Sequence, residues 1–197
     1  MVKRAEDQGL RIMASFEPEW SLARKEGDTY VPVDESLYAS TIGMTTSQAV
    51  IDDIVQALEA QGLHVELFHP ELGHGQLELS IRFADALRAA DNHILYRETV
   101  RNVAWQHGFY ASLAPKPFAD QPGNGCHLHI SAWDTAEENN IFYNPQDPNN
   151  LSRSAYYFIG GVLKHLPGLV ALTAPSVNSY RRLVPSHWSS AFVCYGP

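Results

Sequence analysis

A short segment of the chain carries two histidines two residues apart, directly after a turn bracketed by glycines. It reads Gly123-Asn124-Gly125-Cys126-His127-Leu128-His129-Ile130-Ser131. Side chains alternate between the two faces of an extended strand, so His127, His129 and Ser131 would share one face. Leu128 and Ile130 would point the other way, into a core. Imidazole is the commonest metal ligand but also an ordinary surface group, so this segment alone leaves a binding face and a solvated face equally open.

A second candidate element is the pair Glu17 and Glu19, separated by Pro18. The pair follows a predicted strand at residues 10–16, so the two carboxylates share a face. Proline removes one ladder donor and suits an edge or a strand end rather than a central strand. Carboxylates held side by side repel each other unless a cation lies between them or water separates them. For an isolated pair, the solvated arrangement is the more common.

Two further glutamates flank a bend. Glu71 precedes the bend, which Gly73 and Gly75 mark, and Glu78 follows it in a segment of strictly alternating polar and apolar residues. Such alternation predicts a strand over residues 76–83. Glu71 and Glu78 are therefore expected on two adjacent strands or at their mouth, facing a common point.

The elements that must position these groups follow from periodicity and turn residues. Further strands are predicted over residues 64–68, 110–113 and 191–195, and loops over residues 23–44 and 134–150. Helices are predicted over 45–62, capped by Thr45 or Thr46 and ended by Gly62, over 84–107, and from Ser152 or Ser154 to His165 before Pro167-Gly168. The predicted inward side of the second helix is Leu87, Ala90, Ile94, Val100, Val103 and Ala104.

Composition excludes several classes of protein. The chain has 197 residues, with 22 acidic and 14 basic side chains and a formal charge of −8, which argues against a nucleic-acid partner. The two cysteines, Cys126 and Cys194, lack the spacing of a disulfide framework or a thiolate zinc site. No apolar run of membrane-spanning length and no signal peptide are recognised, so we expect a soluble cytoplasmic protein without a membrane partner.

The candidate groups together suggest one kind of chemistry. Four carboxylates and an imidazole are the hard ligands that suit Mg²⁺ or Mn²⁺, and they are Glu17, Glu19, Glu71, Glu78 and His127. An arginine of the pair Arg181-Arg182 offers a fork of donors for a carboxylate or a phosphate. A solvated basic pair is the default interpretation of these arginines when no acidic or phosphorylated group is expected nearby.

Over nearly its whole length the sequence resembles the catalytic domain of glutamine synthetases and their γ-glutamyl-amide ligase relatives. The matching segments, in family order, are Glu17-Pro18-Glu19, Glu71 to Glu78 with Gly75-Gln76, Ala84-Asp85-Ala86, Pro115-Lys116-Pro117-Phe118, Gly125-Cys126-His127-Leu128-His129 and Asn178-Ser179-Tyr180-Arg181-Arg182-Leu183-Val184-Pro185. The resemblance implies an α+β fold with a curved antiparallel sheet, lined with metal ligands and backed by helices. It also implies that residues 1–197 are a partial catalytic domain, lacking the family's amino-terminal β-grasp domain and its carboxy-terminal part. Such a fragment is expected to be inactive alone, and its full-length parent to be a homo-oligomer.

The resemblance also implies roles for individual residues. Glu19, Glu71 and Glu78 match the ligands of one divalent ion, and Glu17 and His127 match ligands of a second. The matching nucleotide-binding positions are Glu66, Phe83, His129 and Ser131. Gly123 and Arg182 match the glutamate-binding positions, and Arg182 is the expected catalytic residue.

The implied reaction joins L-glutamate to an amine at the expense of ATP. In the family the γ-carboxylate of glutamate attacks the terminal phosphate of ATP, and an amine displaces phosphate from the resulting γ-glutamyl phosphate. At position 188, assigned by its spacing from Arg182, glutamine synthetases have a glutamate that helps to bind ammonium, whereas this chain has Trp188. An indole offers an apolar wall and a π face, so an organic amine is expected in place of ammonia.

Three other functions compete with this interpretation. The first is plain glutamine synthesis from ammonia, with Trp188 only packing under the turn at residues 178–185. The second is a catalytically silent domain used for binding or regulation, against which the retained ligand set argues. The third is an unrelated metal-dependent hydrolase, against which Phe83, His129 and the segment 178–185 argue.

Overall fold

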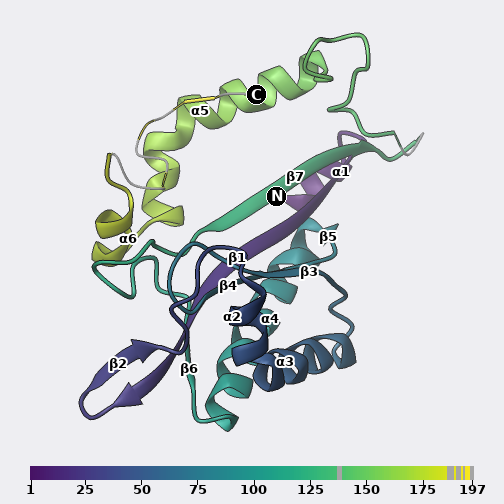
Figure 1. The fold of residues 1–197 in the computed structure, drawn as a ribbon. Helices are drawn as coiled ribbons and strands as arrows, with labels where there is room; N and C mark the ends of the chain where they lie inside the picture. The colour runs from purple at the N-terminus through teal and green to yellow at the C-terminus, as the bar shows by residue number, and fades with distance from the viewer. Residues whose placement is uncertain (137–138, 186–188, 190–191, 193, 196–197) are drawn as a thin grey trace.

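One long strand organises the structure, which is a computed structural model describing residues 1–136, 139–185, 189, 192 and 194–195 (Figure 1). Strand β1 (Leu10–Glu26) pairs antiparallel with five others. They are β2 (Thr29–Pro32), β4 (Gln76–Ile81), β5 (Ala84–Asp85), β6 (Tyr110–Ser112) and β7 (Cys126–Asp134), and β3 (Val65–Pro70) pairs with β4. The helices are α1 (Val2–Glu6), α2 (Thr41–Thr46), α3 (Gln48–Ala60), α4 (Ala86–Gln106), α5 (Arg153–Thr173) and α6 (Val177–Arg182). An α+β fold with an antiparallel sheet is therefore confirmed.

Pro18 lies inside the central strand, so the expectation that it marks an edge or a strand end is wrong. The register explains why proline is accepted there. Pairing with β7 ends at the Pro18–Cys126 pair, and pairing with β4 begins at the Glu19–Glu78 pair. Because proline lacks a backbone N–H, it fits a position where the strand changes partners.

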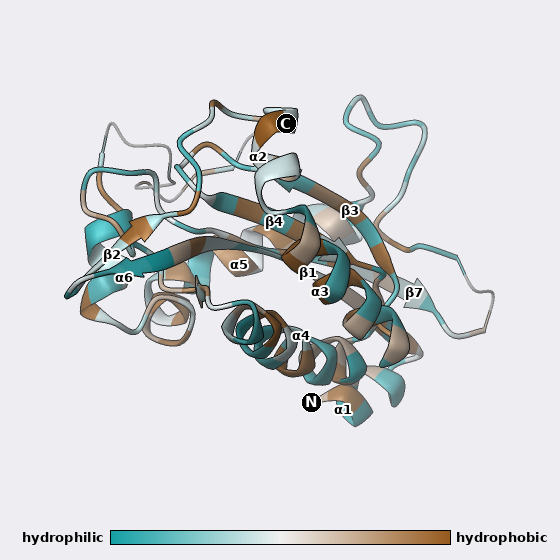
Figure 2. Ribbon diagram, turned by 60° about the horizontal axis from the view of Figure 1, so that its bottom comes forward, coloured by the Kyte–Doolittle hydropathy of each residue, from teal (hydrophilic) through white to brown (hydrophobic). Residues whose placement is uncertain are grey.

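Helices α3 and α4 pack against each other, and α4 also packs against β1. The core between these helices and the sheet is built around Trp20, Leu22, Ile54, Leu58, Leu79, Tyr96 and Val100, all fully buried. The indole N–H of Trp20 donates to the hydroxyl of Tyr96 over 2.9 Å, so the polar atoms of these two large aromatic side chains are partnered within the core. Figure 2 shows this core as hydrophobic colour concentrated where the helices meet the strands.

The predicted inward side of α4 is correct only in its second half. Val100, Val103 and Ala104 are buried, but Leu87, Ala90 and Ile94 are exposed. The buried face of the first half is Ala89, Asn92 and Tyr96, which also recur at helical spacing. Periodicity of apolar residues missed this face because two of its three members carry polar atoms.

Several predicted boundaries are also wrong. Part of the loop predicted at 23–44 is a hairpin, in which Gly27 has a φ of +60° between β1 and β2. Helix α3 begins at Gln48 after Ser47, so Thr45 and Thr46 do not cap it, although Gly62 follows its end with a φ of +76° as expected. Of the strand predicted at 191–195, residues 191 and 193 lie outside the described residues, and Cys194 and Tyr195 are not in a strand.

The predicted stop at Pro167 is wrong, because α5 continues through it to Thr173. A proline removes one helical hydrogen bond, and the uninterrupted turns on either side keep the segment helical. By length and composition alone, α5 is also apolar enough to cross a membrane, with a mean hydropathy of 1.2. The expectation that no apolar run approaches membrane-spanning length is therefore wrong for this helix. A single helix of this kind is weak evidence for a membrane, because core helices of water-soluble proteins pass the same test.

The apolar face of β7 is not covered by other described residues. Leu128 and Ile130 are 50% and 37% exposed, so the prediction that they point into a core is wrong. In Figure 1, α5 lies on the other side of β1 and β7 from α3 and α4. Only 6% of the most apolar 18-residue stretch of α5 is buried. The described residues therefore bury one part of the sheet well and leave the β7 part open.

Candidate metal and nucleotide site

Strand register gathers the candidate ligands into two neighbouring rows across the sheet. In the first row, Glu78 on β4 lies directly opposite Glu19 on β1 and directly opposite His69 on β3. In the second row, Glu17 on β1 lies directly opposite His127 on β7. Residues two apart on one strand share a face, so the rows of Glu17 and Glu19 lie side by side on the same face.

Two groups of side chains have ligand atoms within 4.8 Å of one another, and Glu78 belongs to both. One group is Glu17, Glu78 and His127, and the other is His69, Glu71 and Glu78. Carboxylate and imidazole donors at this spacing fit a divalent cation such as Mg²⁺ or Mn²⁺. The sequence predicted all of these ligands except His69.

Glu17 contacts both histidines of β7. Its Oε2 atom lies 3.3 Å from Nδ1 of His127 and 3.1 Å from Nε2 of His129. Burial raises the pKa of Glu17, but the hydrogen bonds from His129 and His127 outweigh burial and leave that pKa below its usual value. Glu17 is therefore an ionised carboxylate at the junction of the two rows.

Glu78 is the most strongly perturbed acid of the site. Burial, together with the charges of Glu17, Glu71 and Glu19 acting in the same direction, raises its pKa to about 8. Only 6% of this residue is exposed, so water screens the repulsion poorly. A bound cation would remove this repulsion, so the donor set fits a metal ion.

Glu19 is fixed by hydrogen bonds. Its Oε2 accepts from the side-chain amide of Gln76 over 2.7 Å and from the backbone N–H of Gly125 over 2.9 Å. Burial raises the pKa of Glu19 despite the Gly125 N–H, which acts in the opposite direction. Gln76 also donates to the Gly123 carbonyl over 3.1 Å and to Asn124 Oδ1 over 3.1 Å. Gln76 and Asn124 thus connect the acids to the turn before β7, a role that the sequence analysis did not assign.

Arg182 reaches the site because two glycines leave room for it. A Cβ atom on Gly123 would lie 2.8 Å from Arg182 Cγ and would also clash with the Pro115 carbonyl, and one on Gly125 would lie 2.6 Å from Glu19 Oε1. The Nε atom of Arg182 is buried without a hydrogen-bond partner among the described residues. Arg182 is therefore placed beside the acids with donor capacity to spare.

Asn178 anchors helix α6, which carries Arg182. Its Oδ1 accepts the backbone N–H of Lys116 over 2.6 Å, and its Nδ2 donates to the Lys116 carbonyl over 2.9 Å. The Lys116 ammonium in turn donates to the carbonyl of Gln121. Two segments matched by sequence resemblance are thereby joined.

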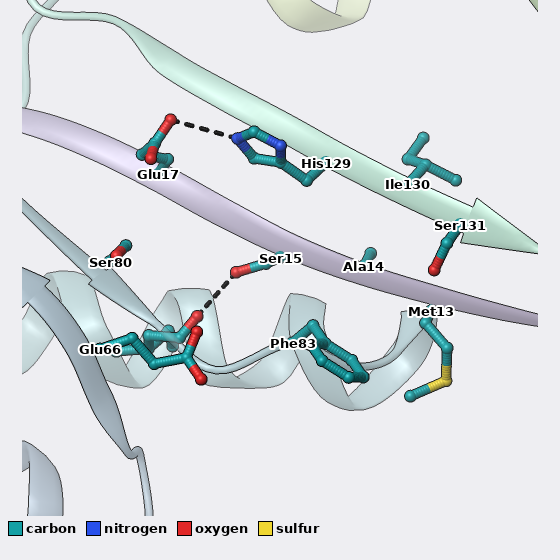
Figure 3. A pocket seen from close by; sticks show the side chains of 11 residues that line it. Met13, Ala14, Ser15, Glu17, Glu66, Ser80, Phe83, His129, Ile130 and Ser131 are labelled. Atoms are coloured by element: carbon teal, nitrogen blue, oxygen red, sulfur yellow. Dashed lines mark hydrogen bonds and ion pairs between the residues drawn. The ribbon is translucent and has the colours of Figure 1, made fainter. Parts of the chain in front are cut away.

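Two cavities meet at Glu17. The acid-lined cavity, of about 950 Å³, contains Glu17, Glu19, Glu71, Glu78 and His127 together with Gly123, Arg182 and Tyr38. The ring-sized cavity, of about 380 Å³, is lined by Glu17 and by all four predicted nucleotide residues, Glu66, Phe83, His129 and Ser131. Figure 3 shows Glu17 and His129 paired at one end of the ring-sized cavity, with Phe83 and Glu66 across from them. Trp188, the predicted amine-binding residue, lies outside the described residues.

Comparisons with known proteins agree with the family resemblance of the sequence. Residues 1–197 match the family model for the glutamine synthetase catalytic domain. A glutamine synthetase of Thermococcus kodakarensis is 38% identical over 198 residues, covering 100% of this chain and 43% of the relative. The gamma-glutamylpolyamine synthetase GlnA3 of Streptomyces coelicolor is 40% identical over 195 residues, covering 98% of this chain and 41% of the relative.

A solved structure described as a GmaS/ADP complex has a TM-score of 0.85 and 34% identity, covering 93% of this chain and 43% of that protein. The chain thus spans about two fifths of the length of the relatives that it matches. Sequence, fold and family model agree: this chain belongs to the glutamine synthetase family.

Proposed function

We propose that the protein containing this chain ligates an organic amine to the γ-carboxylate of L-glutamate, with ATP as co-substrate and Mg²⁺ or Mn²⁺ as cofactor. The observation that carries the proposal is the meeting of the two cavities at Glu17. A nucleotide in the ring-sized cavity would direct its phosphates past Glu17 into the acid-lined cavity, where Arg182 can bind the glutamate carboxylate. Relatives named as ligases support the same class of reaction.

The residues of this chain mainly bind and orient in this proposal. Glu17, Glu19, Glu71, Glu78 and His127 would hold the divalent ions. When bound, such ions neutralise phosphate charge and polarise the transferring group. Phosphoryl transfer depends mostly on positioning and charge neutralisation, which explains a site rich in ligands. The described residues of the two cavities include no cysteine or serine paired with a histidine that would suggest a covalent nucleophile.

The nucleotide base is assigned to the ring-sized cavity. Phe83, which is 54% exposed, offers a free ring face for stacking, and Glu66 and Ser131 offer polar atoms around it. The solved structure described as an ADP complex supports a nucleotide site in this fold. The catalytically silent alternative is disfavoured because both the metal ligands and the nucleotide residues are retained together.

The choice of amine rests on Trp188. An ammonium site benefits from a carboxylate that attracts the cation and accepts a proton as nitrogen attacks. An indole can do neither, but it can pack against an alkyl chain or bind a cationic amine through its π face. A relative that is named gamma-glutamylpolyamine synthetase favours an organic amine, and one that is named glutamine synthetase keeps ammonia as the alternative. We also expect the parent protein to be a cytoplasmic homo-oligomer.

The test is a phosphate-release assay on the complete product of the open reading frame. At fixed ATP and glutamate, the panel contains ammonia, methylamine, a diamine and a polyamine. We expect kcat/KM for one organic amine to exceed that for ammonia by at least about tenfold, which is the lower end of what one fitted methylene group contributes. Trp188→Glu should shift the preference toward ammonia. If ammonia gives the highest kcat/KM and Trp188→Glu does not improve it, glutamine synthesis replaces this proposal.

The 197-residue chain assayed alone is the companion measurement. It covers about two fifths of its relatives, so we expect it to release no phosphate while it retains metal binding. Measurable release that depends on both ATP and glutamate would contradict this expectation.

A further inference from the structure

A third cavity, of about 400 Å³, lies on the side of the sheet that α4 covers, and we call it the helix-side cavity. Pro18 of β1 and its register partner Cys126 of β7 line it, and α4 contributes His93 and Arg97. Side chains alternate along a strand, so Pro18 and Cys126 belong to the face opposite the candidate metal ligands. His93 and Arg97 line neither the acid-lined cavity nor the ring-sized cavity.

Two guanidinium groups reach the helix-side cavity from different elements. Arg97 comes from α4 and Arg182 from α6. Within the described part of the chain neither guanidinium forms an ion pair or a hydrogen bond, and Nε of Arg182 is buried. The charges of both arginines act on the Cys126 thiol, so both lie near one point of the wall. The pKa of that thiol, raised chiefly by burial, is about 11, so Cys126 does not neutralise them.

The other lining residues leave this positive charge largely uncompensated. Glu19 is the one acid among the described residues of the wall, and a metal ion in the acid-lined cavity would neutralise it. Burial and the charge of Arg97 lower the pKa of His93, so its imidazole is neutral and can form hydrogen bonds. Leu113, Pro115 and Pro175 give the wall an apolar part. A cationic end beside an apolar wall is suited to a small organic anion.

We propose that the helix-side cavity binds a small aliphatic carboxylate between Arg97 and Arg182. A guanidinium donates two parallel hydrogen bonds to a carboxylate, and the apolar part of the wall would contact a short alkyl chain. Arg182 also lines the acid-lined cavity, where the proposed function assigns it to glutamate. A carboxylate in the helix-side cavity therefore competes with glutamate for the donors of Arg182, a consequence that rests on the proposed function.

The direct test is ligand-observed ¹⁹F NMR on the complete product of the open reading frame, without ATP or glutamate. The probe is 4,4,4-trifluorobutyrate, and its neutral amide is the chemical control. We expect the carboxylate to bind and the amide not to bind. Arg97→Gln should weaken binding of the carboxylate about tenfold or more, because hydrogen bonds to a charged group are lost.

The matched control variant is Arg101→Gln, since Arg101 is an exposed arginine of the same helix that pairs with Glu98 outside this cavity. That variant should keep the affinity of the unmodified protein. Equal affinity in Arg97→Gln and Arg101→Gln would overturn the proposal. Absence of binding to the unmodified protein would also overturn it, whether or not the Arg97 variant folds.

A kinetic measurement tests the link to Arg182. In the phosphate-release assay, the probe should raise the KM for glutamate without changing kcat, and Arg97→Gln should abolish this rise. An unchanged KM at saturating probe would refute competition for Arg182. Binding that depends on Arg97 in a protein without ligase activity would support the carboxylate site and refute the proposed function, so the two failures are distinguishable.

Discussion

The acid-lined cavity and the ring-sized cavity share Glu17 but differ in how the sequence builds them. The acid-lined cavity concentrates charge: its four carboxylates come from β1, from the end of β3 and from β4, and Glu78 among them is buried. The ring-sized cavity has Met13, Ala14, Ile81 and Ile130 in its wall, with polar atoms at its edges. One cavity is suited to cations and phosphate, and the other to a flat, weakly charged group.

This difference shows why the two cavities should respond differently to substitution. Removing a carboxylate from the acid-lined cavity relieves repulsion in the free protein but removes a ligand from a bound ion. Removing a side chain from the ring-sized cavity takes away contact area and leaves the electrostatics almost unchanged. Each prediction below changes one cavity and uses the other as a reference.

The largest expected effect is that of Glu78→Ala on metal binding. Glu78 belongs to both groups of ligand atoms, so its loss damages two sites at once. We expect Mn²⁺ affinity, measured by calorimetry, to fall by about 100-fold or more. The control is Glu98→Ala, because Glu98 is an exposed acid paired with Arg101 on α4. Equal Mn²⁺ affinity in the two variants would remove Glu78 from the site.

These two cavities also mark how far the sequence could predict the site. Glu17 and Glu19 were expected on one face because a strand alternates, and the nucleotide residues were assigned by resemblance and do line one cavity. His69 was missed because its place beside Glu71 and Glu78 depends on the β3–β4 register, and no local pattern states which residue of β3 lies opposite Glu78. A histidine two residues before Glu71 was the available signal.

The fold shows the same limit. Helix α3 and strand β4 were predicted because a single periodicity runs through each. The buried face of α4 was not, since it includes Asn92 and Tyr96, and the buried Tyr96 hydroxyl finds its partner only in the tertiary structure, where Trp20 on β1 donates a hydrogen bond to it. The exposure of Leu128 and Ile130 depends on whether another element covers β7, which no property of the strand itself decides.

The second prediction concerns the pH dependence of metal binding in the acid-lined cavity. Burial and the neighbouring acids raise the pKa of Glu78 to about 8 in the metal-free protein, and a metal can bind only the ionised carboxylate. Mn²⁺ affinity should therefore rise about tenfold per pH unit below that pKa and level off above it. Proton release during titration, measured in two buffers of different ionisation enthalpy, checks the sign. An affinity that is flat between pH 6 and pH 8 would contradict the prediction.

A smaller effect is expected in the ring-sized cavity from Phe83→Ala. Loss of a stacked ring costs about 1–3 kcal/mol per base, so ATP binding should weaken about tenfold or somewhat more. Mn²⁺ affinity should not change, since Phe83 lines only the ring-sized cavity. Phe158→Ala is the matched control, because Phe158 is a partly exposed aromatic on α5 that contacts Phe142. If both variants bind ATP equally well, the base does not stack on Phe83.

The smallest expected effect is on stability, through Glu78→Gln in the absence of metal. The pKa of Glu78 is about 8 in the folded chain, against 4.5 for an ordinary glutamate carboxyl, so between these pH values the folded state holds the extra proton. Stability of the metal-free chain should therefore fall as pH rises from about 4.5 to about 8, the reverse of the usual acid denaturation. Glutamine mimics the protonated carboxyl at every pH, so Glu78→Gln should match the parent at pH 5 and melt at a higher temperature than the parent at pH 8.5. Thermal unfolding followed by circular dichroism at the two pH values measures this difference.

Saturating Mn²⁺ should reverse the ranking, because only the parent gains the binding free energy of the ion. A variant that is less stable than the parent at pH 8.5 without metal would show that the folded protein already compensates the charges of these carboxylates. Charge repulsion would then not be what distinguishes the acid-lined cavity from the ring-sized cavity.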